Sequence, residues 1–187
     1  MESFAGVVLT GGRSRRFGRD KARFFHRGLP LSAWVMASFA DARVRFLVGR
    51  GPSPLAGVPL YPDRLGEGPL AGIHAALLQS PAPWVALAAT DLVGLSPRFW
   101  RLLWARRGGA PVVVAEGPGG APEPLAALYA RGLWPLAERL LLTGERRARA
   151  LLLAVPAVVV PWAAVWAAAG EGALLNANRP ADLLTKP

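Results

Sequence analysis

The sequence of residues 4–21 reads FAGVVLTGGRSRRFGRDK, and this stretch decides which fold we expect. Its opening residues 4–9 are an apolar run, which is typical of a buried parallel strand. The run ends at Thr10, Gly11 and Gly12, whose types favour a loop over a continued strand. A buried strand that leads into a glycine-rich loop predicts an α/β protein with a ligand site just after its first strand.

The loop after this strand has the composition of a phosphate-binding site. The adjacent glycines allow the backbone to approach a ligand closely, and the arginines and Lys21 that follow supply positive charge. The loop lacks the Gly-Lys-Ser/Thr ending of a P-loop and the glycine spacing of a dinucleotide fingerprint. We therefore expect a nucleoside triphosphate whose base or phosphates are lined by Leu9, Thr10, Gly11 and Gly12.

Apolar runs and helical patterns alternate along most of the remaining chain. This order predicts an α/β fold with a mostly parallel sheet and helices on both faces, forming a single domain over residues 1–187. Strands are expected at 44–48, 58–61, 84–89, 111–115, 125–129, which is a candidate antiparallel strand, and 158–160. Helices are expected at 30–40, 70–78, 96–106, 133–142, 146–153, 163–169 and from Pro180 onward, with a loop at 117–124.

The composition limits the possible partners and chemistries. The chain has a net charge of +10, but only two of its 22 basic residues are lysines, Lys21 and Lys186. The arginines are scattered and are not interleaved with aromatic residues, as a base-stacking surface would require. This charge favours small polyphosphate ligands over nucleic acid. The chain has no cysteine, so disulfides and thiolate metal sites are excluded.

Residues 150–170 carry no charge and follow Arg146, Arg147 and Arg149, so they superficially resemble a membrane span with a basic flank. Pro156 and Pro161 argue against that interpretation, because a proline inside a helix removes a backbone hydrogen bond and clashes with the preceding turn. The two prolines divide the stretch into pieces too short to span a bilayer. We expect a strand between them and no membrane partner.

Four motifs in order resemble those of one known family, the molybdenum cofactor guanylyltransferases, which form the MobA-like branch of the nucleotidyltransferases. The first loop is similar to that family's Leu-x-Gly-Gly-x-Ser-x-Arg-Met/Phe-Gly-x-Asp-Lys signature. The others are Pro62-Asp63 followed by Gly68-Pro69-Leu70-Ala71-Gly72, then Asp91, and finally Asn176-Ala177-Asn178-Arg179-Pro180. Related cytidylyltransferases usually carry Leu-Ala-Ala-Gly in the first motif, so the resemblance favours guanine.

The resemblance implies a Rossmann-like sheet of the nucleotide-diphospho-sugar-transferase type, in a single nucleotidyltransferase domain over residues 1–187. It also implies transfer of GMP from Mg-GTP to the terminal phosphate of molybdopterin, with release of pyrophosphate. It implies Mg²⁺ as cofactor, GTP and molybdopterin as substrates, and a cytoplasmic enzyme that can meet other molybdenum cofactor biosynthesis proteins. Such a reaction needs no protein nucleophile, because positioning and charge stabilisation supply most of the catalysis.

The same resemblance assigns roles to individual residues. Arg16 and Lys21 are expected to neutralise the triphosphate and the departing pyrophosphate. Asp91, at the end of the expected strand 84–89, is the candidate catalytic metal ligand, with Asn178 as a second ligand. Asp63 is a candidate acceptor for guanine or ribose. The acceptor side is assigned to Asn176, Asn178 and Glu123, whereas His26 and His74 are interpreted as structural.

Three departures from the family pattern leave other interpretations open. Asp91-Leu92-Val93 replaces Asp-Thr-Pro, Gly49-Arg50-Gly51 replaces an asparagine, and Glu123-Pro124-Leu125 replaces Gln-Pro-Leu. One alternative is a nucleotidyltransferase for another nucleotide or acceptor, of the cytidylyl or sugar-phosphate type. The other is a nucleotide-binding homologue with weakened catalysis.

Overall fold

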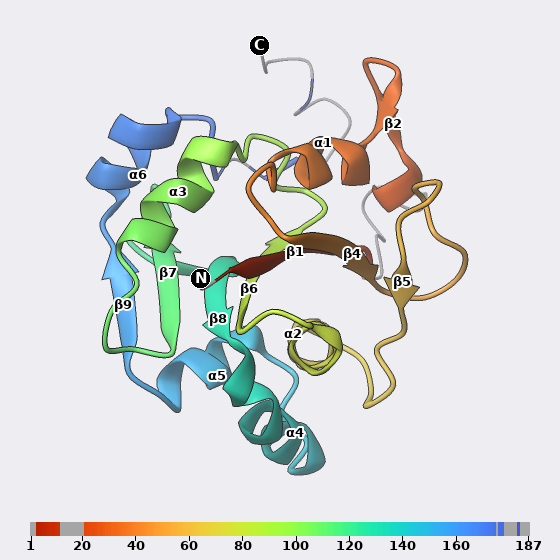
Figure 1. Ribbon diagram of the computed structural model, residues 1–187. Helices are drawn as coiled ribbons and strands as arrows, with labels where there is room; N and C mark the ends of the chain where they lie inside the picture. Colours follow the sequence, from red (N-terminus) through yellow and green to blue (C-terminus); the bar gives the residue numbers. More distant parts are fainter. Residues whose placement is uncertain (1–2, 12–20, 175, 178–182, 184–187) are drawn as a thin grey trace.

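The computed structural model of the protein describes residues 3–11, 21–174, 176–177 and 183. Its main feature is a seven-stranded sheet with the order β5-β4-β1-β6-β8-β7-β9 (Figure 1). The strands are β1 (Phe4–Leu9), β4 (Val44–Val48), β5 (Leu60–Tyr61), β6 (Trp84–Ala89), β7 (Val112–Glu116), β8 (Pro122–Ala130) and β9 (Ala157–Val160).

The sheet is mostly parallel, as the alternating order predicts. β1 lies between β4 and β6 and is parallel to both, and β5 is parallel to β4. β8 is antiparallel to both of its neighbours, β6 and β7. The α/β fold class and the antiparallel strand at 125–129 are confirmed. The expected loop 117–124 is wrong at its end, because β8 already begins at Pro122 and pairs there with Glu116 across a register shift.

Helices cover both faces of the sheet (Figure 1). On one face α2 (Pro69–Gln79), α4 (Trp134–Leu142) and α5 (Ala148–Leu153) pack against alternate strand residues such as Val7 and Leu87. On the other face α1 (Leu31–Ala37), α3 (Pro97–Ala105) and α6 (Trp162–Ala169) pack against residues such as Val8 and Ala88. β1 is buried along its whole length, because both of its faces are covered.

The uncharged stretch 150–170 is divided much as its prolines predict. It contains the end of α5, then β9, then α6, with Pro161 as the residue that precedes α6. Within the parts of the chain that the structure describes, no helix is long and apolar enough to cross a membrane.

Two small features are not predictable from the sequence patterns. A 3-10 turn η1 (Lys21–Arg23) is followed by a hairpin of β2 (Phe25–His26) and β3 (Leu29–Pro30), with Arg27 at φ 48° in its turn. A second 3-10 turn, η2 (Arg131–Leu133), precedes α4. The helix expected from Pro180 falls almost entirely outside the described residues.

Candidate active site

The candidate active site lies along one edge of the sheet, where four neighbouring parallel strands end. In the order β5-β4-β1-β6, these ends lead into Asp63, Arg50, Thr10 with Gly11, and Asp91. The chain passes from β1 to β4 on one side and later to β6 on the other, so β1 is a topological switch point. Ligands of open α/β sheets bind in the crevice outside such strand ends.

Hydrogen bonds between the strand ends hold this edge together. The backbone nitrogen of Thr10 donates to the carbonyl of Val48 over 2.8 Å, and the Thr10 hydroxyl donates to the same oxygen over 3.2 Å. On the other side of β1 the hydroxyl of Thr90 donates to the carbonyl of Leu9 over 2.6 Å. The start of the glycine loop is therefore fixed to both neighbouring strands.

Lys21 and Asp91 meet at this edge although 70 positions separate them in sequence. Lys21 Nζ lies 3.0 Å from Asp91 Oδ2, and the two side chains are only 17% and 24% exposed. Lys21 begins η1, directly after the loop, whereas Asp91 follows β6. The two residues that were expected to handle the phosphates and the metal therefore form one half-buried pair.

Glu123 approaches the same edge from the antiparallel strand β8. Ala88 pairs with Ala126 in the last β6–β8 pair, so continuing this register places Glu123 opposite Asp91. Burial raises the pKa of the Glu123 carboxyl, the backbone nitrogen of Leu125 opposes this by donating to it over 3.1 Å, and the charge of Asp91 raises it further. Glu123, which replaces the glutamine of the family pattern, thus brings a second carboxyl group toward Asp91.

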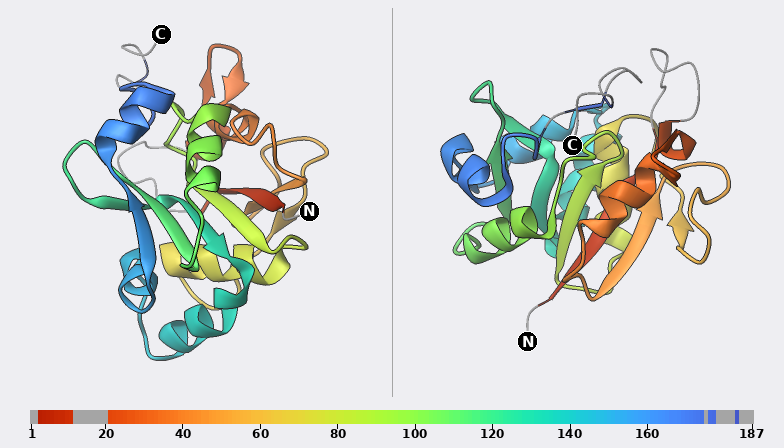
Figure 2. Two further views of the ribbon diagram at one scale, coloured as in Figure 1. Left: turned by 60° about the vertical axis from the view of Figure 1, so that its left-hand side comes forward. Right: turned by 90° about the horizontal axis from the view of Figure 1, so that it is seen from above.

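The C-terminal part of the chain also reaches Asp91. After α6 the backbone returns toward the rest of the molecule (Figure 2). The backbone nitrogen of Ala177 donates to the carbonyl of Asp91, in the loop that follows β6, over 2.9 Å. Ala177 is buried in a small cluster with Leu31 and Leu183. Asn176, its neighbour, is exposed beside this contact.

Arg50 is a site residue that the sequence interpretation missed. Its Nε lies 2.9 Å from Asp63 Oδ1, and its Nη2 donates to the carbonyl of Gly66 over 2.9 Å. Asp63 is only 12% exposed, whereas Arg50 is 57% exposed. The signal in the sequence is an arginine between two glycines directly after a strand, where the family has an asparagine.

The structure gives a physical reason for Gly49 at that position. A Cβ on Gly49 would collide with the Thr10 hydroxyl oxygen and would stand 3.1 Å from the backbone nitrogen of Gly11. The Thr10 hydroxyl, already bonded to Val48, fills the space that a side chain at position 49 would need. Gly49 is therefore coupled to the threonine that begins the loop.

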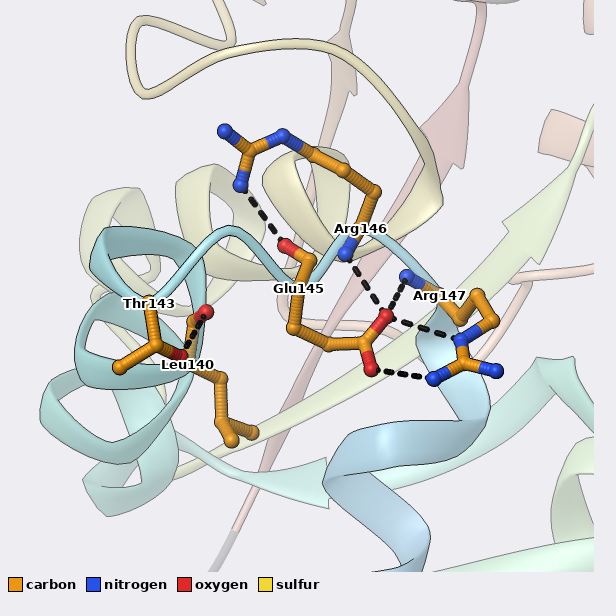
Figure 3. Close-up of polar contacts among 5 residues, drawn as sticks. All are labelled: Leu140, Thr143, Glu145, Arg146 and Arg147. Carbon is orange, nitrogen blue, oxygen red and sulfur yellow. Dashed lines mark hydrogen bonds and ion pairs between the residues drawn. The ribbon is translucent and has the colours of Figure 1, made fainter.

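The motif Gly68-Pro69-Leu70-Ala71-Gly72 forms the start of α2 and packs that helix against the site. The backbone nitrogen of Leu70 donates to the carbonyl of Arg146 over 3.1 Å, and a Cβ on Gly72 would stand 3.1 Å from the Leu9 side chain. Figure 3 shows how Arg146 is held: Glu145 accepts from its backbone nitrogen over 2.8 Å. The side chain of Arg147 also pairs with Glu145, over 2.7 Å.

Some expected site residues lie outside the described part of the chain: Gly12, Arg16 and Asn178. Among the described residues, no group of three or more histidine, aspartate or glutamate side chains could by itself hold a metal ion. Asp91 supplies the hard carboxylate oxygens that Mg²⁺ prefers, and a cationic ammonium already stands against one of them. The side chain of Asp91 therefore has the chemistry that a Mg²⁺ ligand needs.

Comparison with known proteins agrees with this arrangement. Residues 6–158 match the family described as MobA-like NTP transferase domain. A protein of Deinococcus radiodurans, named as a probable molybdenum cofactor guanylyltransferase, is 40% identical over 98% of this chain and 93% of its own length. This chain belongs to the MobA-like NTP transferase family.

Other relatives extend this result. A protein of Opitutus terrae with the same name is 35% identical over 96% of this chain and 93% of its own. The crystal structure of molybdopterin-guanine dinucleotide biosynthesis protein A from Archaeoglobus fulgidus superposes with a TM-score of 0.82 at 27% identity. That likeness covers 96% of this chain and 95% of the other. The predicted family and nucleotidyltransferase fold are confirmed.

Proposed function

We propose that this protein transfers GMP from GTP to the terminal phosphate of molybdopterin, forming molybdopterin guanine dinucleotide and releasing pyrophosphate. The observation that carries the proposal is the Lys21–Asp91 pair at 3.0 Å, placed where β1 and β6 end. The names of the Deinococcus and Opitutus relatives support the choice of guanine and of the molybdenum cofactor.

In the proposed reaction an oxygen of the acceptor phosphate attacks the α-phosphorus of GTP, and the bond to pyrophosphate breaks. Thr10 and Gly11 lie at the end of β1, where the backbone can receive the phosphates together with Gly12. The Lys21 ammonium neutralises the charge that develops on pyrophosphate, and Arg16 has the same role. Mg²⁺, held by Asp91 with Asn178, would supply further charge neutralisation on the phosphates.

The acceptor is proposed to lie on the β8 side of Asp91. Glu123 approaches from β8, and Asn176 lies exposed beside the contact between Ala177 and Asp91. We further propose that one nucleotidyltransferase domain comprises residues 1–187, that the enzyme works in the cytoplasm, and that it meets other molybdenum cofactor biosynthesis proteins there.

The decisive experiment measures pyrophosphate release from GTP, CTP, ATP and UTP with Mg²⁺ and either molybdopterin or a sugar phosphate as acceptor. We expect release only with GTP and molybdopterin together. A preference for CTP, or for the sugar phosphate, would replace this proposal by a related nucleotidyltransferase. GTP binding without pyrophosphate release would indicate a binding protein instead.

A further inference from the structure

The guanidinium of Arg50 joins two segments that follow different strands. Arg50 comes after β4, whereas its two hydrogen-bond acceptors, Asp63 and Gly66, lie in the segment between β5 and α2. Both hydrogen-bond distances are 2.9 Å. A third acceptor, Glu67 Oε1, lies 3.8 Å from Arg50 Nη1. The rigid planar fork of arginine can serve two acceptors at once, which a lysine ammonium does less well.

The Arg50 contact leaves one oxygen of Asp63 facing the nucleotide loop. Oδ1 accepts from Arg50, whereas Oδ2 lies 3.8 Å from the point where a Cβ on Gly11 would stand. Among the described residues, the hydrogen bond and the ion pair of Asp63 both use Oδ1, and none donates to Oδ2. A Cβ on Gly11 would be in ordinary van der Waals contact with this oxygen, so the carboxylate lies directly beside the backbone of the loop.

The position of Asp63 along the site edge suggests which part of a nucleotide it meets. The strand ends run in the order β5, β4, β1, β6, with Asp63 after β5 and the Lys21–Asp91 pair at β6. If the phosphates lie at Lys21 and Asp91, the nucleoside extends toward the β5 side. Guanine presents two adjacent N–H donors at its pairing edge, N1–H and the 2-amino group, whereas adenine presents an acceptor at N1.

We infer that Arg50 is a positioning residue that holds the Asp63 carboxylate toward the glycine loop, so that it accepts from guanine and disfavours adenine. The inference rests on the proposed function, because it assumes that the nucleotide occupies this edge. The arginine supplies orientation: it fixes a partly buried acceptor that would otherwise rotate. A preorganised acceptor gains affinity because less ordering is needed on binding.

The test uses Arg50→Met, which keeps the length of the side chain but removes the fork, and Arg50→Lys. Arg101→Met is the matched control, since Arg101 also pairs with an aspartate, Asp41, at 2.7 Å and is 64% exposed, but on α3. Calorimetry on the full-length protein measures the Kd of GTP, inosine triphosphate, ATP and pyrophosphate. Inosine triphosphate lacks the 2-amino group and so reports on one of the two donors.

We expect Arg50→Met to raise the Kd of GTP by roughly tenfold, a change typical of one lost polar contact, and to leave the Kd of pyrophosphate unchanged. The ratio of GTP affinity to ATP affinity should fall correspondingly, Arg50→Lys should be intermediate, and Arg101→Met should bind like the wild type. In an Asp63→Asn background, adding Arg50→Met should change the Kd of GTP less than twofold, because the two residues act as one unit.

Two results would overturn the inference. Equal weakening of GTP and pyrophosphate would mean that Arg50 merely maintains the fold of the edge, and an unchanged GTP affinity would mean that it plays no part. Either result leaves the proposed function standing, provided that the wild type prefers GTP. If the wild type shows no GTP preference, the proposed function itself fails.

Discussion

Lys21 Nζ and Asp91 Oδ2 lie 3.0 Å apart and join the end of the glycine loop to the end of β6. Both side chains are largely withdrawn from water, so the pair is less screened than a surface ion pair. When nucleotide and metal bind, the Lys21 ammonium can pair with a phosphate and the Asp91 carboxylate can bind the metal cation. The pair thus keeps two charged groups oriented at the place where the proposed reaction would create and neutralise charge.

Replacing Asp91 by Asn tests this arrangement. The amide keeps the shape of the side chain but removes the negative charge that would hold the metal and face Lys21. We expect pyrophosphate release to fall by about 10²–10³-fold, as is typical when one electrostatic contact to a developing charge is lost. The control is Asp41→Asn, whose carboxylate pairs with Arg101 on α3. Turnover within a few-fold of the wild type would remove Asp91 from the site.

The close approach of Thr10 and Gly49 predicts that the stability effects of substituting the two residues are not additive. Gly49→Ala should lower the free energy of unfolding by about 1–3 kcal/mol, because its methyl group overlaps the Thr10 hydroxyl. Thr10→Ala vacates that space, so Gly49→Ala should cost less in the Thr10→Ala background. Urea titrations of the four proteins measure the interaction, with Gly132→Ala as control since nothing lies near its added Cβ. Strictly additive costs would contradict the coupling.

A substitution at Gly94 tests whether the C-terminal contact with the loop after β6 contributes to stability and to binding of the acceptor. A Cβ on Gly94 would collide with the backbone carbonyl of Gly172, just before the segment that reaches Asp91. We expect Gly94→Ala to cost about 1–3 kcal/mol in stability and to raise the KM for molybdopterin more than that for GTP. Gly108→Ala is the control, because its added methyl meets nothing. An unchanged KM for molybdopterin would separate this segment from the acceptor site.

His74 on α2 predicts part of the pH dependence of stability. Burial lowers the pKa of His74 and the charge of Glu138, 3.9 Å away, opposes this only in part. The unfolded chain therefore binds a proton at a higher pH than the folded one. As pH falls below about 6.5, the ordinary histidine pKa, protonation of the unfolded state costs stability until the lowered folded pKa is also passed.

His74→Leu should consequently lose less stability than the wild type between pH 7 and pH 5, measured by denaturant titration at each pH. It also removes the buried Nε2, which has no hydrogen-bond partner among the residues that the structure describes. His26→Gln is the matched control, because His26 is the only other histidine and lies on the small hairpin. An identical pH profile for the wild type and His74→Leu would show that this imidazole is not titrated on unfolding.

Local patterns predicted much of the sheet. The apolar run of β1, the prolines around β9 and the turn residues after Leu9 act within a few positions, so they are readable from the chain itself. Other features escaped prediction. The strands β2 and β3 contain only two residues each, too few for any alternation, and the start of β8 at Pro122 depends on its pairing with Glu116.

The sequence by itself determined the order of the strands of the main sheet and of the helices that cover it, the glycine loop and the motifs that indicate the family. Only the tertiary structure decided which side chains meet, Lys21 with Asp91 and Arg50 with Asp63, and that Glu123 lies near enough to Asp91 for its charge to raise the Glu123 pKa. The reason is that these contacts depend on which strands are neighbours and in what register they pair. The pairing of the strands is determined by the burial of both faces of the sheet, which brings together residues far apart in the sequence. No local sequence pattern predicts these pairings.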